Sequence, residues 1–160
     1  RQRQMCIRDR CTIYFRYYLN QALKASGLGD QFLDNLQIWR DQMALGLTTW
    51  AEMPEPSRSD CHAWGASPNI EFYRILLGID SDAPGFRKIR IAPSLGKLKE
   101  VSGTIPHPLG SVTAAYKLNE RGEGTARLVL PEGTTGIFIW DGKEIPLKPG
   151  EQVISLSSRH

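Results

Sequence analysis

The spacing of hydrophobic residues along the chain changes once, near residue 79. Before this point, apolar residues recur three and four positions apart, which indicates helices. Beyond it they alternate with polar residues, which indicates strands. Turn-forming residues cluster over 79–86, where the change takes place. We therefore expect an α+β chain in which helices come first and strands follow.

The first two helices are expected to form a hairpin. One covers Thr12 to about Ser26 and ends at Gly27, which is suited to a left-handed C-cap. Its predicted apolar face consists of Phe15, Tyr18, Leu19, Ala22, and Ala25 or Ser26. The other covers about 31–45 with Asp30 as its N-cap. Its predicted apolar stripe consists of Phe32, Leu33, Leu36, Trp39, Met43 and Ala44.

A third helix is expected after a polar loop that opens at Gly46. Ser67 is the predicted N-cap, Pro68 suits the first helical position, and Gly78 closes the helix.

Six strands are expected beyond residue 86. Their approximate ranges are 87–92, 98–104, 111–118, 124–130, 135–140 and 152–156. Inward positions are predicted to be Ile89, Ile91, Val112, Ala114, Tyr116, Ala126, Leu128 and Leu130. Asp141 and Gly142 form a hairpin dipeptide, and Pro106 and Pro108 belong in a bend or on an edge. Several short strands at regular spacing predict an antiparallel β-sandwich.

Composition and charge narrow the classes of function. The chain has 160 residues, 41% hydrophobic and 23% charged, which is typical of a globular protein. The first ten residues hold four Arg and one Asp, so they carry the whole net charge of +3. The other 16 basic and 16 acidic side chains cancel, which predicts neither nucleic acid nor a membrane as a partner. No apolar run approaches the ~20 residues of a membrane span.

Residues 1–11 do not match the patterns that follow. They show no helical or strand period, and 1–10 resemble translated adapter sequence, so we treat the segment as a non-native or disordered leader. Cys6, Cys11 and Cys61 have no disulfide or zinc spacing. Free thiols in a reducing compartment are the favoured interpretation, which favours the cytoplasm. Neither a metal site nor a cofactor is predicted.

The loop between the second and third helices holds the candidate chemistry. It contains Trp50, Glu52, Asp60, His62 and Trp64, although such loop residues are often only solvated or core groups. Cleaving a glycosidic bond requires paired carboxyl groups, which stand ~6.5–9.5 Å apart in inverting enzymes. A sugar site also needs an aromatic wall and fixed hydrogen-bonding groups. Glu52 is the candidate carboxylate, with aromatic and imidazole groups around it.

Several stretches together resemble the C-terminal end of bacterial α-L-rhamnosidases, glycoside hydrolase family 78. The most specific are residues 46–52 (GLTTWAE) and 58–69 (RSDCHAWGASPN). Weaker stretches are 76–80 (LLGID), 84–86 (PGF), 91–96 (IAPSLG) and 103–110 (GTIPHPLG). The likeness covers nearly everything from about Tyr14 onward.

This resemblance implies an inverting enzyme that releases terminal L-rhamnose from rhamnose-containing glycosides or oligosaccharides. The catalytic domain would be an (α/α)6 toroid followed by a β-sandwich, so that 12–79 are the last helices and active-site loop of the toroid and 80–160 the sandwich. The family's catalytic base falls on Glu52, and its sugar-contacting His on His62. Family members often place a Trp directly before the Glu, whereas here it is Trp50. Trp50 and Trp64 are the further substrate-binding candidates, with packing roles as the alternative.

The family's general acid lies far upstream and has no counterpart here. We therefore expect a fragment that carries the base and has no hydrolase activity alone. A related toroid glycosidase for another sugar stays open, as does a non-catalytic carbohydrate-binding sandwich. The last alternative predicts that 87–160 bind glycans, and the enzyme hypothesis predicts that they do not.

Other polar and aromatic residues are expected to have structural roles. Arg58 and Asp60 are expected to pair with each other or to cap the loop. Cys61 is expected to be a small filler, His107 to lie on the surface, and Trp140 to pack inside the sandwich.

Overall fold

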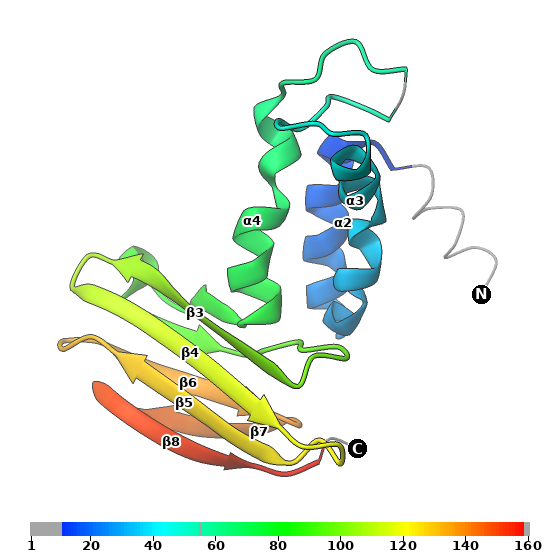
Figure 1. Ribbon diagram of the computed structural model, residues 1–160. Coiled ribbons are helices and arrows are strands. Elements are labelled where there is room, and N and C mark those ends of the chain that lie inside the picture. Colours follow the sequence, from blue (N-terminus) through cyan, green and yellow to red (C-terminus); the bar gives the residue numbers. More distant parts are fainter. Residues whose placement is uncertain (1–10, 55, 159–160) are drawn as a thin grey trace. The chain divides into compact units, whose positions relative to one another are not determined.

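The computed structural model describes residues 11–54 and 56–158 (Figure 1). The chain divides into two compact units after Glu71, a helical unit and a β-rich unit. Of the expected leader, 1–10 lie outside the described residues, whereas Cys11 is described and half-buried. The expected α+β class is confirmed.

The first helix has the expected ends but buries a different face. Helix α2 spans Ile13–Ala25, and the Thr12 hydroxyl accepts a hydrogen bond from the Phe15 amide at 3.2 Å. Gly27 follows with a φ of 75°. The buried residues are Ile13, Asn20 and Leu23. The predicted apolar face was wrong, since Phe15 is 56% and Tyr18 48% exposed. The helix carries two overlapping apolar stripes, and only its packing partners select one of them.

The expected second helix is broken into three pieces. Two 3₁₀ turns, η1 (Gly29–Gln31) and η2 (Leu33–Leu36), precede helix α3 (Gln37–Ala44). The side chain of Asp30 caps none of them, and Asp34 and Asn35 are poor helix formers. Trp39 is buried as expected, and its indole N–H donates to the Gly65 carbonyl at 2.7 Å. Met43, which was predicted to be in the buried stripe, is exposed, and Gln42 is buried instead.

The third helix begins at Pro68 as expected, and a 3₁₀ turn precedes it. A 3₁₀ turn, η3 (Ala63–Ala66), leads into α4 (Pro68–Glu71) and then into the π-helical segment η4 (Phe72–Leu76). Ser67 has helical dihedral angles, φ −53° and ψ −31°, so it is not the N-cap. His62 is the extended residue before the turn, and the Gly65 amide donates to its carbonyl at 3.0 Å. Pro68 therefore has its predicted place at the first helical position, whereas Ser67 does not have its predicted role as N-cap.

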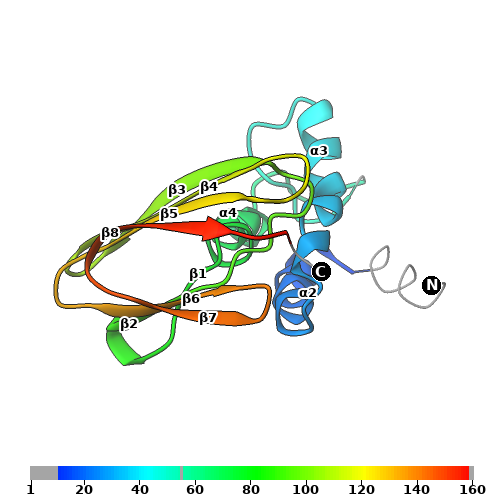
Figure 2. The same ribbon diagram turned by 90° about the horizontal axis from the view of Figure 1, so that it is seen from below.

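Two four-stranded sheets face each other in the β-rich unit (Figure 2). One has the order β1 (Ile79–Ser81), β2 (Lys88–Ile91), β6 (Thr135–Trp140), β7 (Lys143–Leu147). The other has the order β3 (Glu100–His107), β4 (Gly110–Leu118), β5 (Gly124–Leu130), β8 (Gly150–Leu156).

All six expected strands are present, and the short β1 and β7 are additional. The sandwich is not wholly antiparallel, because β2 and β6 pair in parallel. Because β2 and β6 are distant in sequence, no turn motif joins them, and the sequence therefore does not show whether they run parallel or antiparallel. Asp141 and Gly142 form the expected hairpin turn, with φ of 50° and 71°.

The sandwich core follows the expected alternation. All eight predicted inward positions are at most 2% exposed. Phe138 stacks between Tyr116 and Trp140, with ring centroids 6.4 and 6.3 Å away. The Tyr116 hydroxyl donates to the Leu77 carbonyl at 2.8 Å, which satisfies the only polar atom of that buried side chain. Trp140 therefore has the packing role expected of it.

His107 was expected on the surface but is buried. Its Nδ1 accepts from the Leu109 amide at 3.1 Å, so Nε2 carries the proton and donates to the Phe86 carbonyl at 2.8 Å. Pro106, beside it, lies on the edge strand β3 as expected. The imidazole joins two loops, a contact between distant segments that its proline neighbours do not reveal.

Two ion pairs on the sandwich predict a pH-dependent stability. A hydrogen bond from Lys88, at 2.7 Å, lowers the pKa of Asp82, and hydrogen bonds from Arg127, at 2.6 and 2.8 Å, lower the pKa of Glu151. A lowered carboxyl pKa stabilises the folded state above the unfolded pKa, and this is lost as the pH falls through the folded value. We expect the melting-temperature difference between wild type and Glu151→Gln to be small, largest near neutral pH, and absent at strongly acidic pH. Thermal scans across pH measure it, and a difference that grows on acidification would contradict it.

Candidate active-site loop

The polar loop closes on itself as a hairpin after α3. Gly46, with a φ of 80°, ends the helix and lets the chain turn away. The His62 amide donates to the Trp50 carbonyl at 2.8 Å, and the Glu52 amide donates to the Ser59 carbonyl at 2.9 Å. The Thr49 hydroxyl donates to the Asp60 carbonyl. These bonds bring the two motifs of the loop side by side.

The hairpin is attached to the helical unit by buried contacts. Ala51 is 1% exposed, and its amide donates to the Gln42 side-chain oxygen of α3 at 2.9 Å. Gly65 accepts the Trp39 hydrogen bond on its carbonyl. A Cβ added at Gly65 would overlap the Cβ of Trp50, so glycine permits this close packing. The buried amide of Gln42 thus holds the loop backbone in place.

Glu52 is partly open to solvent and is ion-paired. Its side chain is 14% exposed, and the guanidinium of Arg58 binds both carboxylate oxygens, with Arg58 Nε 3.1 Å from Oε2. Arg58 itself is 73% exposed. The expected pairing of Arg58 with Asp60 is therefore replaced by a pairing with Glu52. Cys61, expected to fill a gap, is exposed.

Aromatic residues beside the hairpin form a pocket of about 340 Å³. Its lining consists of Tyr14, Tyr17, Ala63, Trp64, Ala66 and Ser67. The rings of His62 and Trp64 lie 4.4 Å apart, and Tyr14 meets Trp64 edge-on at 5.8 Å. Trp64 stays 40% exposed. The imidazole Nδ1 of His62 is buried without a hydrogen-bond partner among the described residues.

The structure brings some of the candidate residues together. His62 and Trp64 are in ring contact, whereas Trp50 is half-buried behind Gly65. Glu52 is not among the residues that line the aromatic pocket.

Tyr14 and Tyr17 of α2 were not identified from the sequence as site residues. Their spacing of three residues places them on one helix face, which was the available signal. Nothing in the sequence paired that face with Trp64. The hydroxyl of neighbouring Tyr18 hydrogen-bonds that of Tyr14, which raises the pKa of the Tyr18 phenol.

Metal and membrane chemistry can be assessed over residues 11–54 and 56–158. In that part of the chain, no three His, Cys, Asp or Glu side chains gather to hold a metal ion. None of its helices is long and apolar enough to cross a bilayer.

The described chain is thus a helical unit with a carboxylate-bearing loop, followed by a two-sheet β-sandwich. Residues 78–151 match the model of the bacterial alpha-L-rhamnosidase C-terminal domain. Residues 78–151 are therefore similar to the C-terminal domain of bacterial α-L-rhamnosidases, in agreement with the resemblance seen in the sequence.

Solved structures agree on the fold. The α-L-rhamnosidase of Aspergillus terreus superposes with a TM-score of 0.79 at 19% identity, covering 90% of this chain and 19% of that one. The enzyme of Dictyoglomus thermophilum gives 0.75 at 18% identity, covering 89% and 20%. The family 78 enzyme of Bacillus sp. GL1 gives 0.59 at 24%, covering 79% and 16%. This chain spans about a fifth of those chains, and no curated protein matches it.

Proposed function

We propose that this chain supplies the base-bearing side of an inverting α-L-rhamnosidase active site, with Glu52 as the general base. The observation that carries this proposal is that one loop holds both the carboxylate and part of the aromatic pocket. One hairpin, closed by the bond between Trp50 and His62, holds both a partly open carboxylate and the edge of an aromatic pocket. Structural loops seldom hold such groups in a fixed arrangement.

In this mechanism Glu52 takes a proton from the water that attacks the anomeric carbon. One carboxylate oxygen must then face the water. Arg58 binds both oxygens, so it must release one of them when substrate enters. Its 73% exposure allows this movement without the loss of buried contacts. Arg58 thus holds the carboxylate in position until water and substrate arrive.

The aromatic pocket suits the sugar. The faces of Trp64 and Tyr14 offer apolar area to the C–H side of a pyranose ring, and the free Nδ1 of His62 offers a hydrogen bond to a hydroxyl. Trp50 packs closely against Gly65, the residue that follows Trp64, and so supports this wall. The substrate class is a rhamnose-containing glycoside or oligosaccharide.

The rest of the active site would come from the longer protein. We propose that 12–79 are the last helices of an (α/α)6 toroid and 80–160 its C-terminal sandwich. The exposed Phe15 and Tyr18 of α2 are then surfaces for preceding helices. The general acid would lie on those helices, since solved relatives are about five times as long as this chain.

The proposal predicts that the isolated chain does not turn over aryl α-L-rhamnosides above the buffer rate. One carboxylate without a proton donor cannot assist departure of the leaving group. The full-length protein is expected to release β-L-rhamnose first, which proton NMR detects before mutarotation. Turnover by the isolated chain, or α-L-rhamnose as first product, would contradict the proposal.

A further inference from the structure

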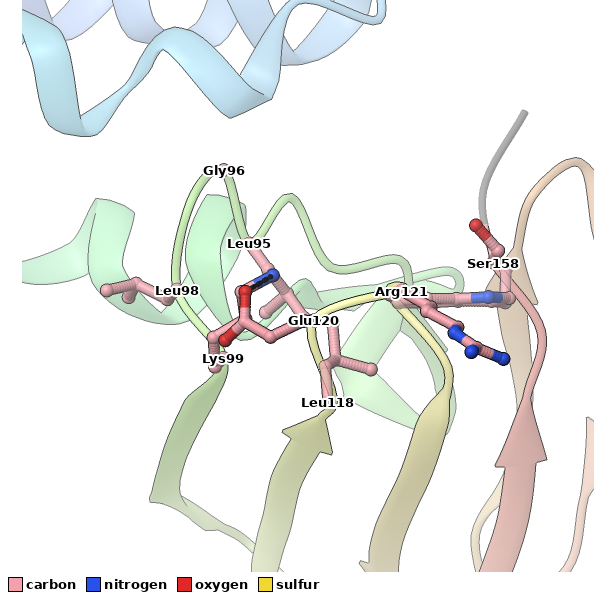
Figure 3. A pocket seen from close by; sticks show the side chains of 10 residues that line it. Leu95, Gly96, Leu98, Lys99, Leu118, Glu120, Arg121 and Ser158 are labelled. Carbon is pink, nitrogen blue, oxygen red and sulfur yellow. Dashed lines mark ion pairs between the residues drawn. The ribbon is translucent and has the colours of Figure 1, made fainter.

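A second pocket lies within the β-rich unit, apart from the candidate active-site loop. Its volume is about 280 Å³ (Figure 3). Four segments line it: the loop before β3, the end of β4 with the turn to β5, the end of β6, and the residues after β8. The lining residues on which the argument depends are Leu95, Lys99, Leu118, Arg121, Trp140 and Ser158.

The floor of this pocket is apolar. Leu95 is 2% and Trp140 5% exposed, and Leu118 is half-buried beside them. The indole N–H of Trp140 donates to the Ser157 carbonyl at 2.8 Å. Trp140 therefore offers a ligand only apolar surface, which suits the C–H face of a ring.

The rim is charged and carries an excess of positive charge. Lys99 Nζ lies 3.6 Å from the Glu120 carboxylate, whose side chain is 93% exposed. Figure 3 shows this pair on one side of the opening and Arg121 on the other, toward Ser158. The guanidinium of Arg121 makes no hydrogen bond or ion pair with any residue that the structure describes. The rim therefore holds two positive side chains, Lys99 and Arg121, and one negative side chain, the solvated Glu120.

The turn that carries Arg121 is held in a fixed conformation. The side-chain oxygen of Asn119 accepts from the amides of Arg121 and Glu123 at 2.9 and 3.0 Å. Gly122, with a φ of 77°, then brings the turn close to Ser158. Because the backbone of this turn is already ordered, a ligand that binds there loses less free energy to ordering it. The cationic rim is thus placed by the fold.

We propose that this pocket binds a single sugar acid, a hexuronate. Arg121 pairs with the carboxylate in the two-bond geometry that guanidinium favours, and the ring lies on the floor of Leu118 and Trp140. Lys99 and Ser158 bind the hydroxyls. A volume at the lower limit of ligand pockets, ~300 Å³, admits one ring rather than a chain. The site replaces the expectation, made with the enzyme hypothesis, that the sandwich binds no sugar. The pocket and the Glu52 loop lie in different units, so either proposal can fail while the other holds.

The test is a ¹⁵N–¹H NMR titration of the 160-residue chain with D-glucuronate and, in parallel, D-glucose. The two sugars differ at one carbon, which carries the carboxylate. We expect saturable shifts with glucuronate at the amides of Gly96, Gly122 and Ser158 and at the Trp140 indole. Glucose is expected to bind at least tenfold more weakly, since it cannot pair with Arg121.

Arg121→Gln is expected to weaken glucuronate at least tenfold and to leave glucose binding unchanged. Arg127→Gln, which changes another exposed arginine of the same unit, is the matched control and retains wild-type affinity. Arg121 is exposed, so the variant folds, and its unshifted core resonances verify this. Equal affinities for the two sugars, no saturable shift, or an Arg121→Gln variant that binds like wild type would overturn the proposal.

Discussion

Glu52→Gln in the full-length protein is expected to lower kcat on an aryl α-L-rhamnoside by ~10²–10⁴-fold, the usual contribution of a general base. Gln has nearly the shape of Glu and still accepts a hydrogen bond from Arg58, but it cannot take a proton from water. KM is expected to change little, because the aromatic pocket remains intact. Initial rates over a range of substrate concentrations measure both constants.

The matched control is Glu132→Gln, an exposed glutamate on a turn of the sandwich. It is expected to leave kcat at the wild-type value. Thermal melting separates lost chemistry from lost folding: an exposed ion pair is worth about 0–1 kcal/mol, so Glu52→Gln should melt close to wild type. A folded Glu52→Gln protein with more than a tenth of the wild-type kcat would exclude Glu52 as the base.

The largest expected loss of stability comes from Gly78→Ala, at about 2–5 kcal/mol. Gly78 has a φ of 75°, where an L side chain costs about 1–2 kcal/mol. A Cβ there would also overlap the backbone of Ala92 and Pro93. Backbone cannot turn aside as a side chain can, and overpacking of this kind adds about 1–3 kcal/mol. The hydrogen bond from the Ala92 amide to the Gly78 carbonyl, at 2.9 Å, lies at the same junction.

Gly142→Ala separates the two costs. Gly142 has a similar φ of 71°, but a Cβ there would meet nothing within 4 Å. It is expected to lose only the conformational part, about 1–2 kcal/mol. Urea unfolding of both variants measures the difference. Equal losses would show that the close approach of Ala92 and Pro93 to Gly78 does not constrain the fold.

Local patterns predicted most of the sandwich. Strands with one buried face must alternate, and a slip of one residue would expose every inward side chain, so Ile89, Ala114 and Leu128 specify their own orientation. The hairpin dipeptide at 141–142 predicts its own turn, yet β7 after it was missed. With exposed Glu144 and half-buried Ile145, that edge strand shows little alternation.

The helical unit was harder to predict because its choices are not local. The aromatic stripe of helix α2 is exposed, whereas Ile13, Asn20 and Leu23 are buried, and the partners that the helix meets decide which face becomes buried. Buried Gln42 looks like a surface residue until its oxygen is seen to hold the Ala51 amide. Arg58 has three acidic neighbours in the loop sequence, Glu52, Glu55 and Asp60, and only the folded hairpin showed that Glu52 is its partner.

The amino-acid sequence by itself determined the order of helices and strands, the inward positions of the sandwich, and the family that residues 78–151 resemble. Each of these follows from residues close together in the chain or from a motif. The tertiary structure alone decided that Glu52 meets Arg58, that Tyr14 and Tyr17 complete a pocket with Trp64, and that Arg121 faces a second pocket. The two pockets join segments far apart in sequence, and the pairing of Glu52 with Arg58 depends on how one loop folds back on itself. Local propensity encodes neither kind of packing geometry.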